Sequence, residues 1–199
     1  MASGLAPPEI DTNFARRVQS LFPSWAARAG NSAGIEVRLV VEPDGKVREC
    51  RLEGIVGNRR LAEEVCTELS TLRMTTATGP DGNPSFAIVR TYFQFLVNGD
   101  ERAQVERYVP APFREFAVAG LPESPGRRIS LALNVAIAGN GALSLCQATS
   151  GSSAPGLAPL VRAACRQLEQ DSFDVLAGAD GNPVSYVTTV NVNFVPAAT

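Results

Sequence analysis

The chain has 199 residues, of which 45% are hydrophobic, 7% are aromatic and 19% are charged, and its formal net charge at pH 7 is −2. Because the 18 basic and 20 acidic residues are interspersed, the sequence lacks the basic footprint of a nucleic-acid-binding protein. It contains no histidine, so the usual general base and the commonest metal ligand are both missing.

The beginning of the sequence predicts a short extension. No apolar run reaches the ~20 residues of a membrane-spanning helix, and no signal peptide is recognisable. We therefore expect no membrane span in this chain, and a native signal or anchor is not visible. Residues 1–21 are predicted to form an N-terminal extension with one short helix, capped by Asp11 or Thr12.

The next segment predicts a β-hairpin. Apolar and polar residues alternate from Ile35 to Val41, which is typical of a half-buried strand. Pro43-Asp44-Gly45 predicts a turn, and Lys46 to Glu53 predicts the returning strand. Cys50 and Leu52 can share a face of a regular strand with each other but not with Val47, so a β-bulge is predicted near Arg48.

A helix and a third strand follow the hairpin. Asn58 is the predicted N-cap of a helix with an apolar stripe at helical spacing, and Pro80 to Pro84 predicts a turn. Ala87 to Val97 predicts a strand. Its inward positions are Val89, Thr91, Phe93 and Phe95, and its outward positions are Arg90, Tyr92 and Gln94.

The same marks recur in the second half of the chain, which indicates a tandem duplication. Gly45 and Cys50 are matched by Gly141 and Cys146, and Cys66 is matched by Cys165. The tetrapeptide Asp-Gly-Asn-Pro follows Cys66 and Cys165 at the same distance, and a closing strand follows the tetrapeptide each time. We therefore predict an α+β fold of two tandem β-β-α-β units, each a three-stranded antiparallel sheet covered by one helix.

The repeat also predicts the domain boundaries. After the extension, the first domain covers residues 22–97 and the second, more degenerate domain covers residues 116–199. A charged, proline-punctuated connector of residues 98–115 joins them, with helical character around residues 101–107. Domains of this size have thin cores, so covalent or interface support is expected.

The four cysteines support two interpretations. Metal binding would need close pairs such as Cys-x-x-Cys, which are absent, so no metal site and no cofactor are predicted. Free buried thiols are one alternative. The other is one local disulfide used twice, Cys50 with Cys66 and Cys146 with Cys165, because the matched positions place a strand cysteine beside a helix cysteine in each repeat. A paired set would favour an oxidising compartment.

No residue pattern predicts catalysis, and we expect no enzyme activity. The carboxylate pairs Glu63-Glu64 and Glu101 near Glu106 are explained by a solvated helix face and a charged connector. The serines from Ser150 to Ser153 lack both a Gly-x-Ser-x-Gly frame and a base, and are more simply a loop.

The first repeat resembles the TonB C-terminal domain family. That family opens with an aromatic residue, a proline, an alanine and a glycine, followed by a strand and Asp-Gly-x-Val. The matching residues are Phe22, Pro23, Ala26, Gly30, Gly34, Val37, Leu39, Val41, Asp44, Gly45 and Val47. The second repeat keeps the strands, the helix and the tetrapeptide. Its opening segment, Phe116 to Gly126, lacks the aromatic-proline pair, and its turn lacks the aspartate.

The resemblance implies a periplasmic module that takes part in energy transduction for transport. In this family the domain captures an extended peptide of an outer-membrane receptor along the edge of its third strand, by β-strand addition. The partner implied here is therefore a protein or extended peptide of the TonB-dependent receptor type. The first repeat is the better candidate, because it keeps Phe22 and Pro23 and presents Arg90, Tyr92 and Gln94 outward. The membrane anchor and the proline-rich spacer of the family are not visible in this sequence.

A second class of function stays open on the sequence alone. The chain would then be a structural or scaffolding periplasmic protein whose third-strand edges pair with each other, or with those of a second copy, and bind no receptor. The state of those edges distinguishes the two hypotheses.

Overall fold

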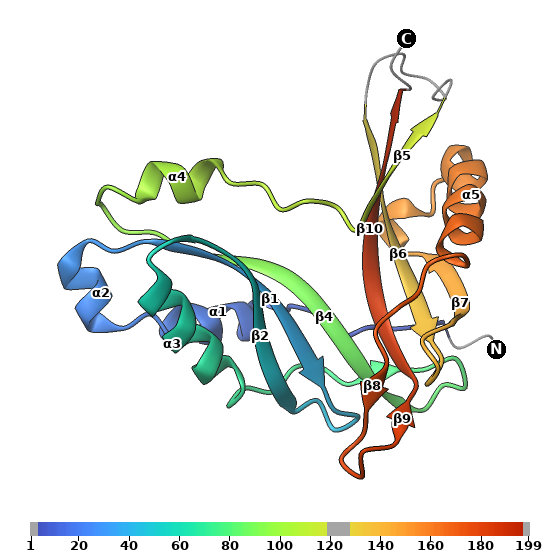
Figure 1. Cartoon of the computed structure of the whole chain (residues 1–199), viewed down its shortest axis with the longest axis horizontal. Helices are drawn as coiled ribbons and strands as arrows, with labels where there is room; N and C mark the ends of the chain where they lie inside the picture. The colour runs from blue at the N-terminus through green and yellow to red at the C-terminus, as the bar shows by residue number, and fades with distance from the viewer. Residues whose placement is uncertain (1–3, 119–127, 197–199) are drawn as a thin grey trace. The chain divides into compact units, whose positions relative to one another are not determined.

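A computed structural model describes residues 4–118 and 128–196 of the chain. The fold is α+β, and the chain divides into two compact units, whose elements are labelled in Figure 1. We call residues 7–77 and 84–110 the N-terminal unit, and residues 1–6, 78–83 and 111–199 the C-terminal unit.

The N-terminal unit contains the first repeat and the connector helix. In this unit β1 pairs with β2 on one side and with β4 on the other, and both pairs are antiparallel. The short strand β3 (Ala77–Thr78) lies where the chain passes from one unit to the other. The other elements are α1 (Thr12–Ser20), α2 (Ser24–Ala29), β1 (Ala33–Val41), β2 (Val47–Gly57), α3 (Arg59–Leu69), β4 (Pro84–Phe95) and α4 (Arg102–Arg107).

Two helices begin at the predicted N-caps. The Asp11 side chain accepts a hydrogen bond of 2.6 Å from the Phe14 N–H at the start of α1, and Asn58 accepts one of 3.0 Å from the Leu61 N–H at the start of α3. These side chains satisfy backbone donors that have no partner within a helix. Both caps were predicted from the sequence and are confirmed.

The core of the N-terminal unit lies on one face of its sheet. The inward face of β1 is closed by apolar residues of α1 and α3. The strand is not half-buried as its alternation predicts, because its other face is covered as well and Arg38 is only 7% exposed. The fully buried members of this core are Phe14, Val18, Ile35, Val37, Leu39, Val41, Leu61, Val65, Leu69 and Phe95. Figure 1 shows α1 and α3 on one side of these strands and α4 on the other. Both faces of the sheet are therefore covered.

The hairpin of β1 and β2 has two β-bulges. Val40 pairs with Glu49 and Val41 pairs with Val47, so Arg48 is the extra residue, and the predicted bulge is confirmed. A second register shift leaves Glu53 as an extra residue further along β2. Bulges increase strand twist, which lets a short sheet wrap over a helix.

The C-terminal unit contains the second repeat. Its opening segment was predicted to run from Phe116 to Gly126, of which residues 119–126 lie outside the described residues. The elements are β5 (Arg114–Val118), β6 (Ile129–Ile137), β7 (Leu143–Ala148), the 3₁₀ turns η1 (Ser150–Ser152) and η2 (Pro155–Leu157), α5 (Ala158–Leu168), β8 (Leu176–Ala177), β9 (Pro183–Val184) and β10 (Tyr186–Pro196).

The sheet of the C-terminal unit has the strand order β7-β6-β10-β5. The pairs β7-β6 and β6-β10 are antiparallel, whereas β5 is parallel to β10. On α5 the apolar stripe of Leu160, Ala164 and Leu168 is buried. β7 repeats the bulge of β2, because Ala136 pairs with Leu145 and Ile137 pairs with Leu143. The sequence did not predict the fourth, parallel strand.

Each unit contains one disulfide between its second strand and its helix. Cys50 is bonded to Cys66 with a Cα–Cα distance of 5.6 Å, and Cys146 is bonded to Cys165 with a Cα–Cα distance of 5.8 Å. Disulfides persist in oxidising compartments, so the pairs assign the chain to one of these. Among the helices of the described residues, none has the length and apolar character of a membrane span.

Candidate functional site

The candidate site is the outer edge of β4, meaning the side that points away from β1. Along a strand, the N–H and C=O groups of one residue point to the same side, and successive residues alternate. The Val97 N–H and C=O both bond to the Ser32 hydroxyl, at 3.0 and 3.1 Å, on the β1 side. By alternation, the backbone groups of Gln94, Tyr92 and Arg90 point away from β1.

One hydrogen bond agrees with this assignment. The Gln19 side chain in α1 donates to the Gln94 C=O at 3.4 Å, which requires that this carbonyl does not face β1. The contact is long, and so it is weak. The outward residues predicted from the sequence are thus the residues whose main-chain groups line the outer edge.

The corresponding edge of the second repeat carries an added strand. The residues of β10 equivalent to Arg90, Tyr92 and Gln94 are Thr189, Asn191 and Asn193. The Phe113 N–H donates to the Asn191 C=O at 2.8 Å, and β5 continues from there in parallel with β10. The outer edge of a third strand in this fold therefore accepts an extended segment.

The two residues of the aromatic-proline pair lie at the end of β4 and at the start of α2. The Phe22 ring stacks on the Phe95 ring, with centroids 6.0 Å apart and planes 12° apart. Pro23 is the N-cap residue of α2. The pair therefore fixes the end of β4 and the start of α2, and neither residue lies in the row of outward main-chain groups.

The side chains of the three outward residues contact the unit itself. Arg90 forms an ion pair of 3.3 Å with Glu53, and both side chains are about one-third exposed, at 31% and 32%. The Tyr92 hydroxyl and the Gln94 amide both donate to the Val105 C=O of α4, at 3.3 and 3.0 Å. These side chains hold α4 on the sheet, so main-chain groups are the better candidates for partner contact.

A second tyrosine fastens the segment after α4. The Tyr108 hydroxyl donates to the Glu36 carboxylate, and the rings of Tyr108 and Tyr92 lie 5.4 Å apart. The hydrogen bond to Glu36 raises the pKa of Tyr108, and burial raises it further. Burial is also the main cause of the raised pKa of Tyr92. Both phenols therefore stay protonated at neutral pH.

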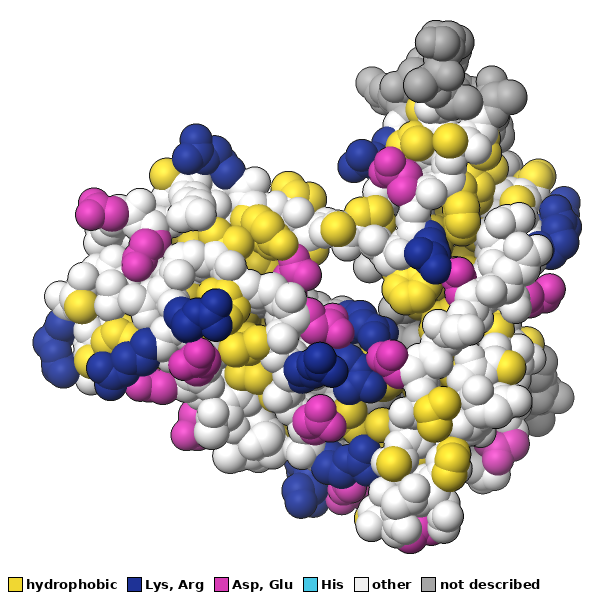
Figure 2. Space-filling view, in the orientation of Figure 1, with side chains coloured by type: hydrophobic (Ala, Val, Ile, Leu, Met, Phe, Trp, Pro, Cys, Tyr) yellow, Lys and Arg dark blue, Asp and Glu magenta, His cyan; other side chains and the backbone are white. Residues whose placement is uncertain are grey.

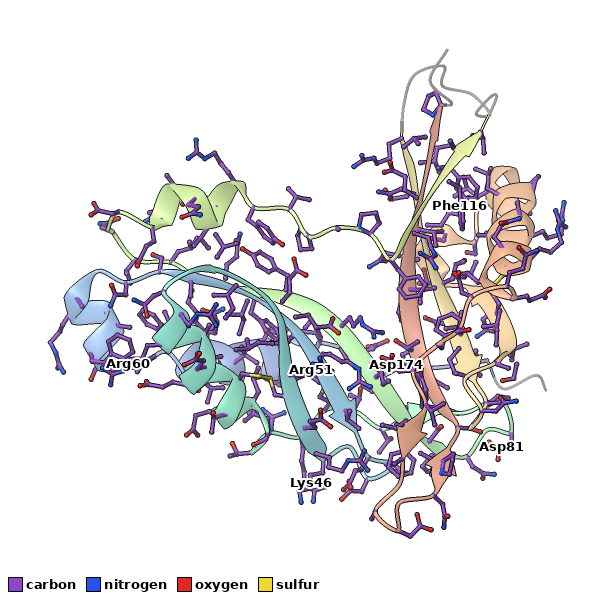
Figure 3. All side chains as sticks on the ribbon, viewed as in Figure 1. Lys46, Arg51, Arg60, Asp81, Phe116 and Asp174 are labelled. Carbon is purple, nitrogen blue, oxygen red and sulfur yellow. A yellow bond between two sulfur atoms is a disulfide. The ribbon has the colours of Figure 1, made fainter. Side chains whose placement is uncertain are left out.

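The carboxylates considered as acid-base pairs have structural partners. Glu63 and Glu64 form i,i+4 ion pairs with Arg59 and Arg60 on α3, at 3.7 and 3.0 Å. Glu64 also accepts a hydrogen bond of 2.7 Å from the Trp25 indole, the main cause of its lowered pKa. Figure 3 labels Arg60 on α3.

The other carboxylate pair is also engaged. The Glu101 carboxylate accepts a hydrogen bond of 2.8 Å from the Ser32 N–H, and Glu106 pairs with Arg102 at 2.8 Å. On the face of the molecule in Figure 2, Lys and Arg side chains are interspersed with Asp and Glu side chains, without a continuous basic patch. In residues 4–118 and 128–196 no cluster of three or more histidine, cysteine or acidic side chains could hold a metal ion.

Two features of the site were missed in the sequence. The strand β5 crosses the predicted boundary between connector and second domain, and its short alternation of Phe116 and Val118 was the available signal. The contacts of α4 with Tyr92 and Gln94 had no sequence signal, because they depend on where the connector packs.

Comparison with known proteins gives no assignment. No family model matches the chain, and no curated protein and no solved structure matches it. The functional argument therefore depends on the residues and the geometry above.

Proposed function

We propose that the chain is a non-enzymatic, TonB-like periplasmic module that binds an extended peptide of a partner by β-strand addition to β4. The observation that carries this proposal is the pairing of β5 with β10, because the equivalent edge in the second repeat accepts an extended segment in the same way. The two β-β-α-β repeats would then share one mode of binding, in which main-chain hydrogen bonds supply most of the affinity.

The position of β4 in its own unit supports this proposal. β4 pairs with β1 along one side, and its main-chain groups at Tyr92 and Gln94, which point away from β1, correspond to those that β5 engages in β10. α4 and Phe22 brace the strand on its two faces, which would keep it extended before a peptide arrives. A pre-organised edge loses less conformational entropy on binding.

The partner we propose is an outer-membrane receptor of the TonB-dependent type, in energy transduction for transport. The resemblance of Phe22, Pro23 and the Asp44-Gly45 turn to the TonB C-terminal domain supports that choice. The two disulfides support an oxidising compartment, and the periplasm is the oxidising compartment that such receptors face.

The test uses substitutions at one position. Tyr92→Ala and Tyr92→Pro both remove the side chain, but only the proline removes the outward N–H. Synthetic peptides that tile the periplasm-facing segments of TonB-dependent receptors are screened against the wild-type chain, and calorimetry gives the affinities of those that bind. We expect Tyr92→Ala to weaken binding a fewfold and Tyr92→Pro to abolish it, with the circular dichroism spectra of both near wild type.

Thr91→Pro is the matched control for backbone direction. The Thr91 N–H faces β1, so this proline should disrupt the sheet itself and change the circular dichroism spectrum. If Tyr92→Pro stays folded and keeps wild-type peptide affinity, the site is elsewhere. If no receptor peptide binds the wild-type chain, the scaffolding hypothesis is the better one.

A further inference from the structure

The segment β5 already occupies the outer edge of β10 as a bound peptide would. It runs parallel to β10, with Arg114 opposite Val192 and Phe116 opposite Phe194. The Phe113 N–H begins this pairing with its bond to the Asn191 C=O. Figure 3 labels Phe116 on this strand.

Three side chains hold β5 in place. The Arg114 guanidinium donates two hydrogen bonds to the Asp171 carboxylate, at 3.0 and 2.6 Å, in a bidentate arrangement. The Phe113 ring stacks on Phe173, with centroids 5.5 Å apart and planes 1° apart. The Phe116 ring packs on Phe194 at 5.4 Å, so aromatic contacts flank the ion pair on both sides.

β5 is little buried, and its further ion pair, Glu115 with Arg128 at 3.3 Å, lies between half-exposed side chains. Arg114, Glu115 and Ala117 are exposed, and Phe116 and Val118 are half-buried, whereas most of β10 is buried. A five-residue edge strand with few buried contacts belongs to the least stable part of a domain. β5 can therefore separate from β10 while β10, β6 and β7 stay paired.

The surface that receives β5 consists of largely buried side chains with a defined chemistry. The Asp171 side chain is only 16% exposed and lies just beyond α5, where its carboxylate faces the guanidinium. A planar guanidinium matches a carboxylate through two parallel bonds, whereas a lysine cannot form that pair. Phe173 and Phe194 are 9% and 2% exposed and form fixed contacts for the two aromatic rings.

From these contacts we propose that the outer edge of β10 is a second peptide-binding site, for which β5 is the built-in ligand. The partner it takes is an extended segment with the pattern aromatic-Arg-x-aromatic, which binds parallel to β10 after displacing β5. This site lies in the C-terminal unit and does not depend on the proposed binding at β4.

The test removes the built-in ligand and supplies it in trans. The full chain with Arg114→Ala and Phe116→Ala keeps Asp171, Phe173 and Phe194. The probe is a labelled synthetic peptide of residues 111–118, Ala-Pro-Phe-Arg-Glu-Phe-Ala-Val. Fluorescence anisotropy should show that this variant binds the peptide at least about tenfold more tightly than the wild-type chain, in which β5 competes.

Changes in the peptide and in the receiving surface test the specificity. Replacing the peptide arginine with alanine, or adding Asp171→Asn to the double variant, should weaken binding about ten- to a hundredfold, as expected for loss of a charged hydrogen-bonded pair. Arg162→Ala removes an exposed arginine of the same unit, and it should leave the peptide affinity of the wild-type chain unchanged. Tyr92→Pro, added to the double variant, should also leave peptide affinity unchanged, which separates this site from β4.

Hydrogen exchange of the amides of residues 114–118 shows whether β5 has separated from β10 in the double variant. Fast exchange in the double variant, with peptide binding, supports the proposal. Fast exchange without binding overturns it, because the edge would be vacant and still take no peptide. Slow exchange overturns the anchoring role of Arg114 and Phe116, and equal peptide affinity for wild type and variant places binding elsewhere. If the double variant does not fold, the single substitution Arg114→Ala is measured in the same way.

Discussion

Tyr108 donates its hydroxyl hydrogen bond to Glu36, and this bond joins the connector to the central strand of the N-terminal unit. Tyr108→Phe keeps the ring against Tyr92 and removes only this bond. A hydrogen bond to a charged group contributes roughly 1.5–3 kcal/mol, and this one is partly exposed. We therefore expect the free energy of local opening of α4 to fall by about 1 kcal/mol. Hydrogen exchange should become faster in residues 102–107.

Tyr186→Phe is the control for that change. Tyr186 donates at 3.0 Å to the Asp174 C=O in the C-terminal unit, so its substitution also removes a tyrosine hydroxyl. It should leave the exchange of residues 102–107 at the wild-type rate. Equal acceleration in both variants would show that α4 responds to general destabilisation and not to the Glu36 contact.

The raised tyrosine pKa values predict a loss of stability in alkaline solution. The pKa of Tyr108 is raised above 10.0 by its bond to Glu36, and that of Tyr92 is raised by burial. Both favour the protonated phenol in the folded state, so their contribution is complete below pH 10 and is lost as the pH rises through the folded values. Ultraviolet absorbance of tyrosinate should rise together with the exchange rate of α4. In Tyr108→Phe the alkaline change in α4 should be smaller.

The two disulfides should each stabilise their own unit. The cysteines are 16 and 19 residues apart, and in the chain-entropy model loops of that size contribute about 3 kcal/mol each. Replacing Cys50 and Cys66 with alanine should lower the denaturant midpoint followed by fluorescence of Trp25, the only tryptophan, which lies in the N-terminal unit. Replacing Cys146 and Cys165 should leave that signal closer to wild type. A smaller shift for the first pair would contradict the prediction.

Local features were predictable because they depend on neighbouring residues. Asp11 and Asn58 cap helices through their own side chains, and the bulge at Arg48 follows from which residues can share a face of the strand. The cysteine pairs followed from matched positions in two copies of one pattern. These inferences required no knowledge of distant packing.

The side-chain contacts at β4 and β5 were not predictable, because they join residues that are far apart in the sequence. Arg114 and Asp171 are 57 residues apart, and Tyr108 and Glu36 are 72 apart, so each pair is set by tertiary structure. The sequence predicted that Tyr92 and Gln94 point outward from the core, but it did not predict that α4 covers their side chains. The sequence therefore placed the proposed site on β4 but did not predict the segments that pack around it.

The turn glycine Gly45 should tolerate substitution less well than Gly181 or Gly151. Its φ of +84° lies in the left-handed region, and an added Cβ would lie 2.4 Å from the Met74 C=O oxygen, a backbone atom that cannot move away cheaply. Left-handed backbone costs a residue with a Cβ about 1–2 kcal/mol, and the clash adds to that cost. We expect Gly45→Ala to destabilise the N-terminal unit by more than about 2 kcal/mol, measured by urea unfolding followed by fluorescence.

Two glycines separate the causes of that loss. Gly181 has a φ of +79° with no atom within 4 Å of an added Cβ, so Gly181→Ala should show only the backbone term, about 1 kcal/mol. Gly151 has neither a positive φ nor a close neighbour, and Gly151→Ala should be nearly neutral. Circular dichroism during urea unfolding reports all three variants. If Gly45→Ala and Gly181→Ala lose equal stability, the Met74 carbonyl does not constrain the turn, and left-handed backbone alone explains the glycine.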